Sequence, residues 1–245
     1  VRVLIPNIVT MLAICSGLTA MRFAIEGRME AALIAVIFAS LLDGMDGRLA
    51  RLLKGTSRFG AELDSLADFV NFGVVPGIIL YITFLKDYGS VGWIVSLLFA
   101  IATAMRLARF NVEAERENVP LWQSRFFSGV PAPAGALCAL LPLYLEHAGT
   151  ARELIPSGIV LVYALAIALL MVSRVPTFSG KTLQVNIRRE YVAMLLIVLV
   201  ALISLLVAYT FQMLAVLTLL YLAMMPVSWQ AHSRMKRAAV PAGEA

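Results

Sequence analysis

The sequence predicts an all-α protein, a polytopic bundle of membrane-spanning helices. Of its 245 residues, 61% are hydrophobic and only 14% are charged, and the mean hydropathy is +0.88. A water-soluble domain of this length does not need so much apolar material, so a helical membrane protein is expected. The alternating pattern of a transmembrane β-barrel is absent, and the apolar runs are too long for barrel strands.

Eight apolar segments qualify as candidate spans in windows of about 20 residues. They lie near residues 6–25, 29–53, 65–85, 90–110, 128–147, 153–173, 190–208 and 211–231. The last two segments are joined so closely that they could form a helical hairpin.

Basic residues are distributed unevenly between the two sides of this bundle. If the N-terminus is cytoplasmic, only four of the 20 lysines and arginines fall outside, namely Arg22, Arg28, Lys86 and Arg152. An excess of basic residues marks the cytoplasmic side of a membrane protein. The net charge of +5 follows from this bias, and no basic patch with interleaved aromatic residues suggests nucleic acid. We therefore expect a lipid bilayer as partner and no nucleic acid.

The second span carries acidic residues at its cytoplasmic end. Residues 29–53 would form a helix about 37 Å long, more than the hydrocarbon core needs. Asp43, Asp46 and Arg51 therefore lie at or beyond the headgroup level. Carboxylates near a bilayer are costly and usually have a function.

Four aspartates follow helical spacing across this turn. Asp43 and Asp46 are three residues apart, and Asp64 and Asp68 are four apart, so each pair shares a helix face. Antiparallel neighbours joined by a short loop would bring the two faces together. Carboxylates this close must be neutralised by protons or cations. Mg²⁺ and Mn²⁺ prefer oxygen ligands and often share carboxylates with substrate phosphates. The pattern predicts two divalent metal ions and phosphate chemistry.

Small and basic neighbours agree with that prediction. Gly44 and Gly47 each destabilise a helix by about 1 kcal/mol relative to alanine. Glycine is therefore expected in a helix where a backbone or a ligand must come close. Arg51 could make a two-pronged contact with a phosphate. Two alternatives are structural ion pairs with nearby arginines and an ion relay in a cation-coupled transporter. A transporter is expected to have carboxylates near the bilayer midplane and inverted repeats, and this sequence has neither pattern.

The spacing Asp43-x-x-Asp46-Gly47-x-x-Ala50-Arg51, eight residues, Gly60-x-x-x-Asp64-x-x-x-Asp68 resembles the signature of the CDP-alcohol phosphotransferase family. The resemblance implies a membrane enzyme that moves a phosphatidyl or similar group from a CDP-linked donor to an alcohol and releases CMP. It also implies a six-helix core, a homodimer, and a site in a polar cavity at the cytoplasmic face.

The same resemblance assigns roles to individual positions. The metal ligands would be Asp43, Asp46, Asp64 and Asp68, and Asp68 would also be the general base that deprotonates the acceptor hydroxyl. The CDP-binding residues would be Asn7, Thr10, Gly47, Ala50, Arg51, Ser57 and Gly60, with Asn7 and Thr10 taken from the Pro6-Asn7-x-x-Thr10 start of the first span.

Further stretches resemble the bacterial membrane-type phosphatidylserine synthases of this family. They are Asp64 to Pro76, Arg106-Leu-Ala-Arg109-Phe-Asn111, Phe127 to Pro133, and Ser173 to Lys181. This resemblance implies CDP-diacylglycerol and L-serine as substrates and a location in the bacterial inner membrane. The serine carboxylate needs a basic partner, and the candidates are Arg106, Arg109, Arg125 and Lys181. Ordinary cytoplasmic charge is the alternative for each, and glycerol 3-phosphate or inositol phosphate remains an alternative acceptor.

Eight spans exceed the six-helix core that the resemblance implies. We therefore divide the chain into a CDP-alcohol phosphotransferase core at 1–189, an additional transmembrane helix pair at 190–231, and a basic cytoplasmic tail at 232–245.

Overall fold

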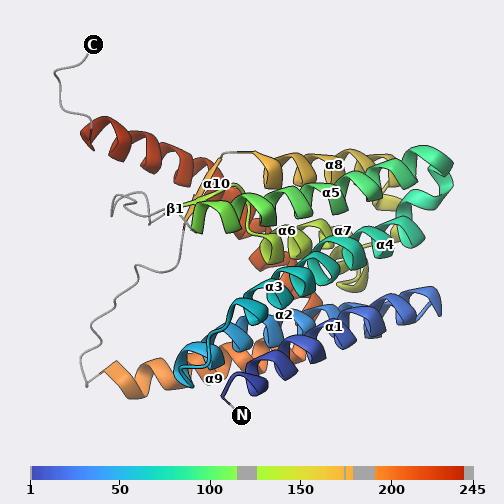
Figure 1. The fold of residues 1–245 in the computed structure, drawn as a ribbon. Helices are drawn as coiled ribbons and strands as arrows, with labels where there is room; N and C mark the ends of the chain where they lie inside the picture. Colours follow the sequence, from blue (N-terminus) through green and yellow to red (C-terminus); the bar gives the residue numbers. More distant parts are fainter. Residues whose placement is uncertain (1, 115–125, 174, 179–190, 240–245) are drawn as a thin grey trace.

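The computed structural model describes residues 2–114, 126–173, 175–178 and 191–239, which form a helical bundle (Figure 1). Its α-helices are α1 (Leu4–Ile25), α2 (Met29–Leu52), α3 (Arg58–Phe69), α4 (Val75–Leu80), α5 (Gly89–Ala114), α6 (Ala132–Ala139), α7 (Leu141–His147), α8 (Ser157–Val172), α9 (Val192–Ala208) and α10 (Thr210–Ala239). Two short strands, β1 (Phe126–Ser128) and β2 (Pro176–Phe178), pair antiparallel. The predicted all-α membrane bundle is confirmed, with this small sheet as an addition.

Each expected span corresponds to helical structure, but two spans differ in detail. The third is a continuous rod in which the π-helical turns η1 (Val70–Val74) and η2 (Tyr81–Leu85) flank α4. The fifth is divided into α6 and α7 at Leu140, two residues before Pro142. Proline removes a backbone donor and clashes with the preceding turn, which accounts for the break.

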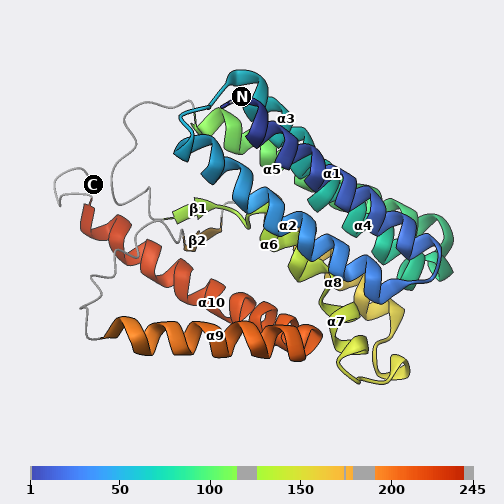
Figure 2. The ribbon, with the colours of Figure 1, turned by 90° about the horizontal axis from the view of Figure 1, so that it is seen from below.

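The C-terminal pair forms a hairpin in which a single residue separates α9 from α10 (Figure 2). Helix α10 continues to Ala239, so no break marks the start of the basic tail expected at residue 232. Residues 240–245 lie outside the described part of the chain.

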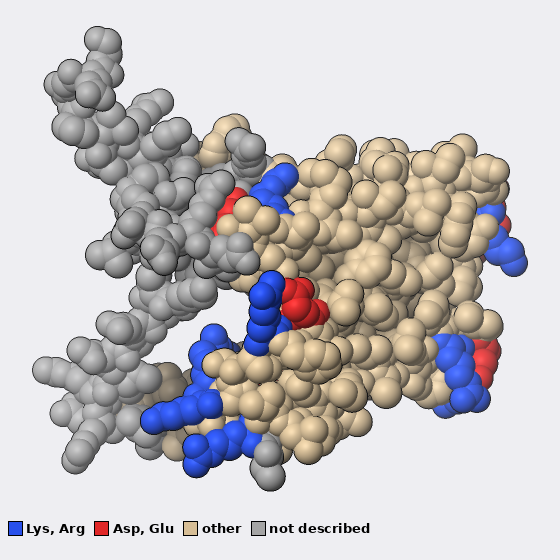
Figure 3. Space-filling model, viewed as in Figure 1, with Lys and Arg blue, Asp and Glu red and all other residues tan. Residues whose placement is uncertain are grey.

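Apolar surface and charge are arranged as a membrane protein requires. Among the described residues, Leu4–Ile25, Arg58–Glu113 and Thr210–Gln230 are long and apolar enough to cross a membrane, and the second stretch holds both α3 and α5. The visible charged side chains gather toward two ends of the molecule, and uncharged surface lies between them (Figure 3). This distribution places an apolar belt between two polar ends.

Small residues let the first two helices approach closely. The buried face of α1 consists of proline, threonine, glycine and alanine, and α2 contributes Ala32 and Ala39 to the contact region. Lipid tails are as apolar as leucine, so close backbone packing is what favours helix association in a membrane. Helix α1 also packs on α3, and it therefore holds α2 and α3 in place.

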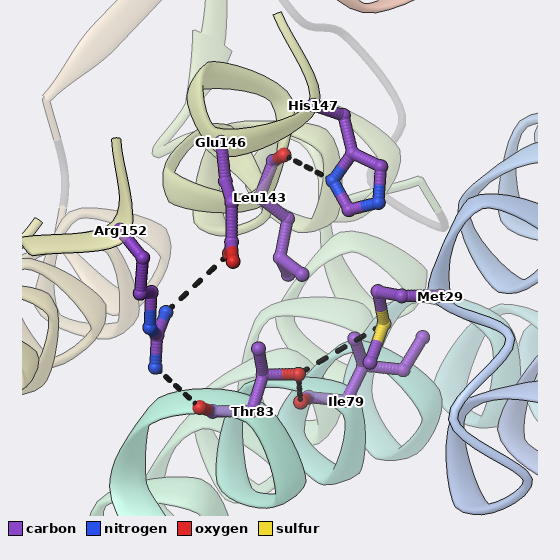
Figure 4. A network of polar contacts seen from close by, with 7 residues as sticks. All are labelled: Met29, Ile79, Thr83, Leu143, Glu146, His147 and Arg152. Atoms are coloured by element: carbon purple, nitrogen blue, oxygen red, sulfur yellow. Dashed lines mark hydrogen bonds and ion pairs between the residues drawn. The ribbon is translucent and has the colours of Figure 1, made fainter. Parts of the chain in front are cut away.

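Arg152 ties the connection before α8 to the bundle (Figure 4). Its Nη2 donates to the Thr83 carbonyl at 2.6 Å, and its guanidinium carbon lies 3.6 Å from the Phe84 ring centroid. Its Nη1 lies 3.4 Å from Glu146 Oε2. Thr83 Oγ1 also lies 3.9 Å from the sulfur of Met29, the first residue of α2. This network therefore closes the end of the bundle opposite the aspartates.

Candidate active site

Three of the four aspartates converge between α2 and α3. Asp43 comes from α2, and Asp64 and Asp68 come from one face of α3. One carboxylate oxygen of each lies within 4.8 Å of the others, and all three side chains are half-buried. The structure thus brings together the two helix faces that the sequence spacing placed opposite each other.

This carboxylate group requires positive charge. Two carboxylates 4.8 Å apart repel by about 3 kcal/mol at an effective dielectric constant of about 20. Asp68 Oδ1 is also buried without a hydrogen-bond partner in the described part of the chain, which costs about 1–3 kcal/mol. An acidic, oxygen-only group with an unsatisfied buried oxygen fits a divalent cation of the Mg²⁺ or Mn²⁺ type.

Asp46 lies beside this group, and both of its oxygens have partners. Its side chain is 4% exposed. Thr10 donates from Oγ1 to Asp46 Oδ2 at 2.6 Å, and the Gly47 amide donates to Oδ1 at 2.5 Å. Thr10, expected at the nucleotide, here connects α1 to α2. The role of Asp46 as a metal ligand stays a prediction.

Asn7, Ser57 and Gly60 meet at the start of α3. Ser57 is the N-cap of this helix, and its hydroxyl accepts from the Gly60 amide at 3.0 Å. A Cβ on Gly60 would lie 3.0 Å from Asn7 Oδ1 and 3.1 Å from Ser57 Oγ, closer than most real Cβ contacts. Glycine at position 60 therefore lets α1 approach, and three residues expected at CDP form one wall.

The facing side of α2 is open. A Cβ built on Gly47 would meet nothing within 4 Å. Ala50 is half-buried and Arg51 is exposed. Positions 43, 47 and 50 share a helix face, so there is room for a ligand next to Asp43.

The two arginines at the end of α5 differ in their surroundings. Arg106 is 7% exposed, and its Nε donates to the Val130 carbonyl at 2.9 Å. Its guanidinium carbon lies 5.3 Å from the Phe110 ring centroid, and Asp68 is near enough to interact with its charge. Arg106 is therefore held rigidly beside the carboxylate group.

Arg109 instead secures the end of α8. Its Nη1 donates to the carbonyl of Val172 at 2.6 Å and lies 3.4 Å from that of Ser173. The last carbonyls of a helix have no partner within the helix, and a cation can satisfy them. Arg125 and Lys181, the other expected acceptor residues, lie outside the described residues.

Asn71 was not assigned to the site by sequence reasoning. It is 1% exposed in η1, three residues after Asp68, and its amide has no hydrogen-bond partner in the described part of the chain. It packs against Gly17 of α1, where an added Cβ would overlap its Oδ1. A polar residue one turn from Asp68 within an apolar run was the available signal.

Comparison with known proteins agrees with this arrangement. The family model described as CDP-alcohol phosphatidyltransferase matches residues 3–175, and a second, CDP-alcohol phosphatidyltransferase 2, matches residues 190–226. The first match includes all four aspartates and both arginines of α5. The second covers most of α9 and α10.

Three relatives share the printed name CDP-diacylglycerol–serine O-phosphatidyltransferase. The Mycobacterium leprae protein is 37% identical over 223 residues, which is 91% of this chain and 73% of that protein. The Helicobacter pylori protein (strain 26695) is 34% identical over 231 residues, or 92% and 91%. The Mycobacterium tuberculosis protein (strain H37Rv) is 47% identical over 143 residues, which is 58% of this chain and half of that protein.

The aspartate group, the open face of α2 and the apolar helices agree with a family match over most of the chain. The chain belongs to the CDP-alcohol phosphatidyltransferase family, whose members are membrane transferases.

Proposed function

We propose that this enzyme transfers the phosphatidyl group of CDP-diacylglycerol to the hydroxyl of L-serine and releases CMP. The observation that carries the proposal is the Asp43, Asp64 and Asp68 group with Arg106 beside it. The names of the relatives support CDP-diacylglycerol as donor and serine as acceptor.

Asp43, Asp64 and Asp68 would hold divalent metal, with Asp46 as a further ligand of a two-ion site. Bound Mg²⁺ or Mn²⁺ would neutralise charge on the diphosphate and on the departing phosphate. Arg51 reaches from the end of α2 to a phosphate oxygen. Gly47 leaves space for the nucleotide, whose other side is bounded by the wall of Asn7, Ser57 and Gly60.

Asp68 acts as general base. Its unpartnered Oδ1 accepts the proton of the serine hydroxyl while the serine oxygen attacks the phosphorus nearer the lipid. The new bond joins phosphorus to the serine oxygen, and the phosphorus–oxygen bond to CMP breaks. Asp68 then releases its proton to solvent. Most of the rate enhancement comes from positioning and from fixed charge.

Arg106 receives the serine carboxylate. Its Nε is fixed by the Val130 carbonyl, whereas its terminal nitrogens make no hydrogen bond in the described part of the chain. A planar guanidinium can bind a carboxylate with two parallel hydrogen bonds. Arg109 is already engaged by α8, and this favours Arg106 over Arg109. Arg125 and Lys181 remain further candidates.

The donor enters sideways from the bilayer, because its acyl chains remain in the lipid. We place the site at the cytoplasmic face of a bacterial inner membrane, because the basic residues of the sequence concentrate on the side of the aspartates. A homodimer is part of the same proposal by family resemblance.

CMP release from the purified full chain tests the reaction and its acceptor. CDP-diacylglycerol and Mn²⁺ or Mg²⁺ would be supplied in detergent with L-serine, glycerol 3-phosphate, inositol phosphate or no acceptor. We expect release with serine alone, accompanied by phosphatidylserine. Release with another alcohol instead would reassign the acceptor. No release with any acceptor, from folded protein, would reject the transferase and favour the transporter.

A further inference from the structure

One turn of α1 contacts both of the helices that carry the aspartates. Asn7 lies at the start of α3, where a Cβ on Gly60 would come within 3.0 Å of its Oδ1. Thr10 donates to Asp46 of α2. Asn7 and Thr10 are three residues apart and are therefore neighbours on the helix surface. Helix α1 packs along both α2 and α3, so this turn lies between the two sides of the candidate active site (Figure 2).

The bond between Thr10 and Asp46 is short and shielded from solvent. The distance from Thr10 Oγ1 to Asp46 Oδ2 is 2.6 Å, the length of a charge-assisted O–H···O⁻ hydrogen bond. Each of the two residues is 4% exposed. Water cannot readily replace the hydroxyl at so buried a position, so Asp46 depends on Thr10 for a donor to Oδ2.

The Thr10 hydroxyl has a second acceptor within its own helix. Threonine in a helix commonly donates to the carbonyl four residues earlier, as exposed Thr19 does to Cys15 at 2.6 Å. For Thr10 the corresponding distance, to the Pro6 carbonyl, is 3.1 Å. A hydroxyl has a single hydrogen, and the shorter distance assigns it to Asp46. The hydroxyl is therefore directed at a carboxylate of the neighbouring helix.

Both oxygens of Asp46 are held by these contacts. The Gly47 amide donates to Oδ1 at 2.5 Å, and Thr10 donates to Oδ2. Each carboxylate oxygen keeps a further lone pair, so the two bonds leave room for a cation. Carboxylates that bind metal are themselves hydrogen-bonded, which fixes their orientation. Asp46 is also one turn from Asp43, a member of the aspartate group. A carboxylate held in this way suits a metal ligand.

We infer that Thr10 is a positioning residue that holds Asp46 in place as a ligand of divalent metal. Its hydroxyl fixes Oδ2 from α1, and the Gly47 amide fixes Oδ1 from the backbone of α2. Thr10 was expected at CDP, but its hydroxyl is directed at a carboxylate. The inference rests on the proposed function and adds to it the residue that orients one ligand.

The variant Thr10→Val removes the hydroxyl and keeps the shape of the side chain. Mn²⁺ would be titrated into the metal-free full chain in detergent, without substrates, and free Mn²⁺ would be followed by electron paramagnetic resonance. We expect Mn²⁺ affinity to fall about tenfold, as for the loss of a hydrogen bond to a metal ligand. Thr10→Ala should give the same fall, and Thr10→Ser, which keeps the hydroxyl, should stay within about twofold of the unaltered protein.

The control is a second hydrogen bond between α1 and α2, away from the aspartates. Ser16 Oγ donates to the Ala35 carbonyl at 2.8 Å, about two turns before Asp43. Ser16→Ala also removes a bond between these helices, but it should leave Mn²⁺ affinity unchanged. An equal fall in Ser16→Ala and Thr10→Val would show that looser helix packing, and not the orientation of Asp46, lowers the affinity.

A double variant tests whether Thr10 acts through Asp46. Asp46→Asn alone should weaken Mn²⁺ binding, and adding Thr10→Val should change it by less than about twofold, because both substitutions affect one ligand. Unchanged Mn²⁺ affinity in folded Thr10→Val or Asp46→Asn protein would overturn the inference. So would a higher KM for CDP-diacylglycerol at saturating Mn²⁺ with unchanged Mn²⁺ affinity, which would place Thr10 at the nucleotide. The binding measurements need no turnover, so absence of serine-dependent CMP release from the unaltered chain would instead be a failure of the proposed function.

Discussion

Asp68 differs from the other aspartates in its surroundings. It is the member of the group with a buried oxygen that lacks a partner in the described part of the chain, whereas both oxygens of Asp46 are bonded to Thr10 and Gly47. A proton acceptor needs a free lone pair directed at the substrate, and a structural carboxylate does not. The hydrogen bonds therefore separate two residues that the sequence spacing treats alike.

The substitution Asp68→Asn tests this separation. The amide has the same shape but cannot accept a proton, so we expect a folded protein that binds CDP-diacylglycerol and loses about 10²–10⁴-fold in kcat. CMP release and equilibrium binding of the donor measure the two properties. Turnover at the level of the unaltered enzyme would contradict the assignment of Asp68 as the general base.

The variant Gly47→Ala tests whether the open space beside α2 receives the nucleotide. A Cβ at this position meets no atom within 4 Å, and alanine favours a helix by about 1 kcal/mol, so the fold should be as stable or more stable. If the open side of α2 receives the nucleotide, the KM for CDP-diacylglycerol should rise about tenfold or more.

The control for this position is Met45→Ala on the exposed, opposite side of α2. Thermal melting in detergent and donor titration measure the two effects. An unchanged donor KM in Gly47→Ala would show that the nucleotide does not approach this face.

Sequence spacing predicts helix faces well and hydrogen-bond partners poorly. Asp43, Asp64 and Asp68 meet because residues three or four apart share a face, which any regular helix guarantees. The bond from Thr10 to Asp46 and the bond from Arg109 to Val172 join residues 36 and 63 positions apart. Such pairs depend on how helices approach each other, which is not encoded in local spacing.

At the level of elements, the end of the bundle opposite the site depends on one cation. Arg152 donates to Thr83, covers the Phe84 ring and contacts Glu146 from a connection with little packing of its own. Its partners belong to η2 and α7, so it fastens both elements to the connection that precedes α8.

Arg152→Ala should therefore reduce stability without changing the chemistry. The side chain is 37% exposed, so we expect about 1–2 kcal/mol, equivalent to a melting temperature lower by about 2–6 °C. Arg22→Ala is the comparison, because Arg22 is 76% exposed and pairs with Glu26 four residues along the same helix, where such pairs contribute little. Equal shifts in melting temperature for the two variants would contradict the role given to Arg152.

Hydropathy predicted where helices lie but not how they are interrupted. The run from 128 to 147 is apolar apart from its two ends, so a hydropathy window by itself does not reveal the break at Leu140, which Pro142 explains, or the strand that precedes α6. The strands β1 and β2 are three residues each and depend on pairing across about 50 positions of sequence, which a window of about 20 residues cannot detect.

At the level of the whole molecule, one end carries the candidate active site and the other holds the helices together. The aspartates, Arg51 and Arg106 gather where α2 ends, α3 begins and α5 ends, and the Arg152 network lies at the far end. An apolar belt separates the two ends (Figure 3). The charge bias in the sequence predicted this polarity, because charged residues avoid the hydrocarbon core.

The two C-terminal helices have similar apolar composition but different surroundings. Hydropathy assigns both to the membrane, yet α9 is exposed from residue 194 to 208, whereas α10 buries Ala215, Thr218, Met225 and Ser228. The difference arises because α10 contacts β2 and α7, and a hydropathy window cannot detect such contacts.

Metal dependence of serine incorporation tests the central claim most directly. The full chain would be stripped of metal with a chelator, returned to buffer, and titrated with Mn²⁺ while labelled L-serine is followed into chloroform-soluble lipid. We expect no incorporation before Mn²⁺, recovery on titration, and no recovery in Asp64→Asn, which removes one carboxylate of the group. Full incorporation by the metal-free protein would contradict an active site built on Asp43, Asp64 and Asp68.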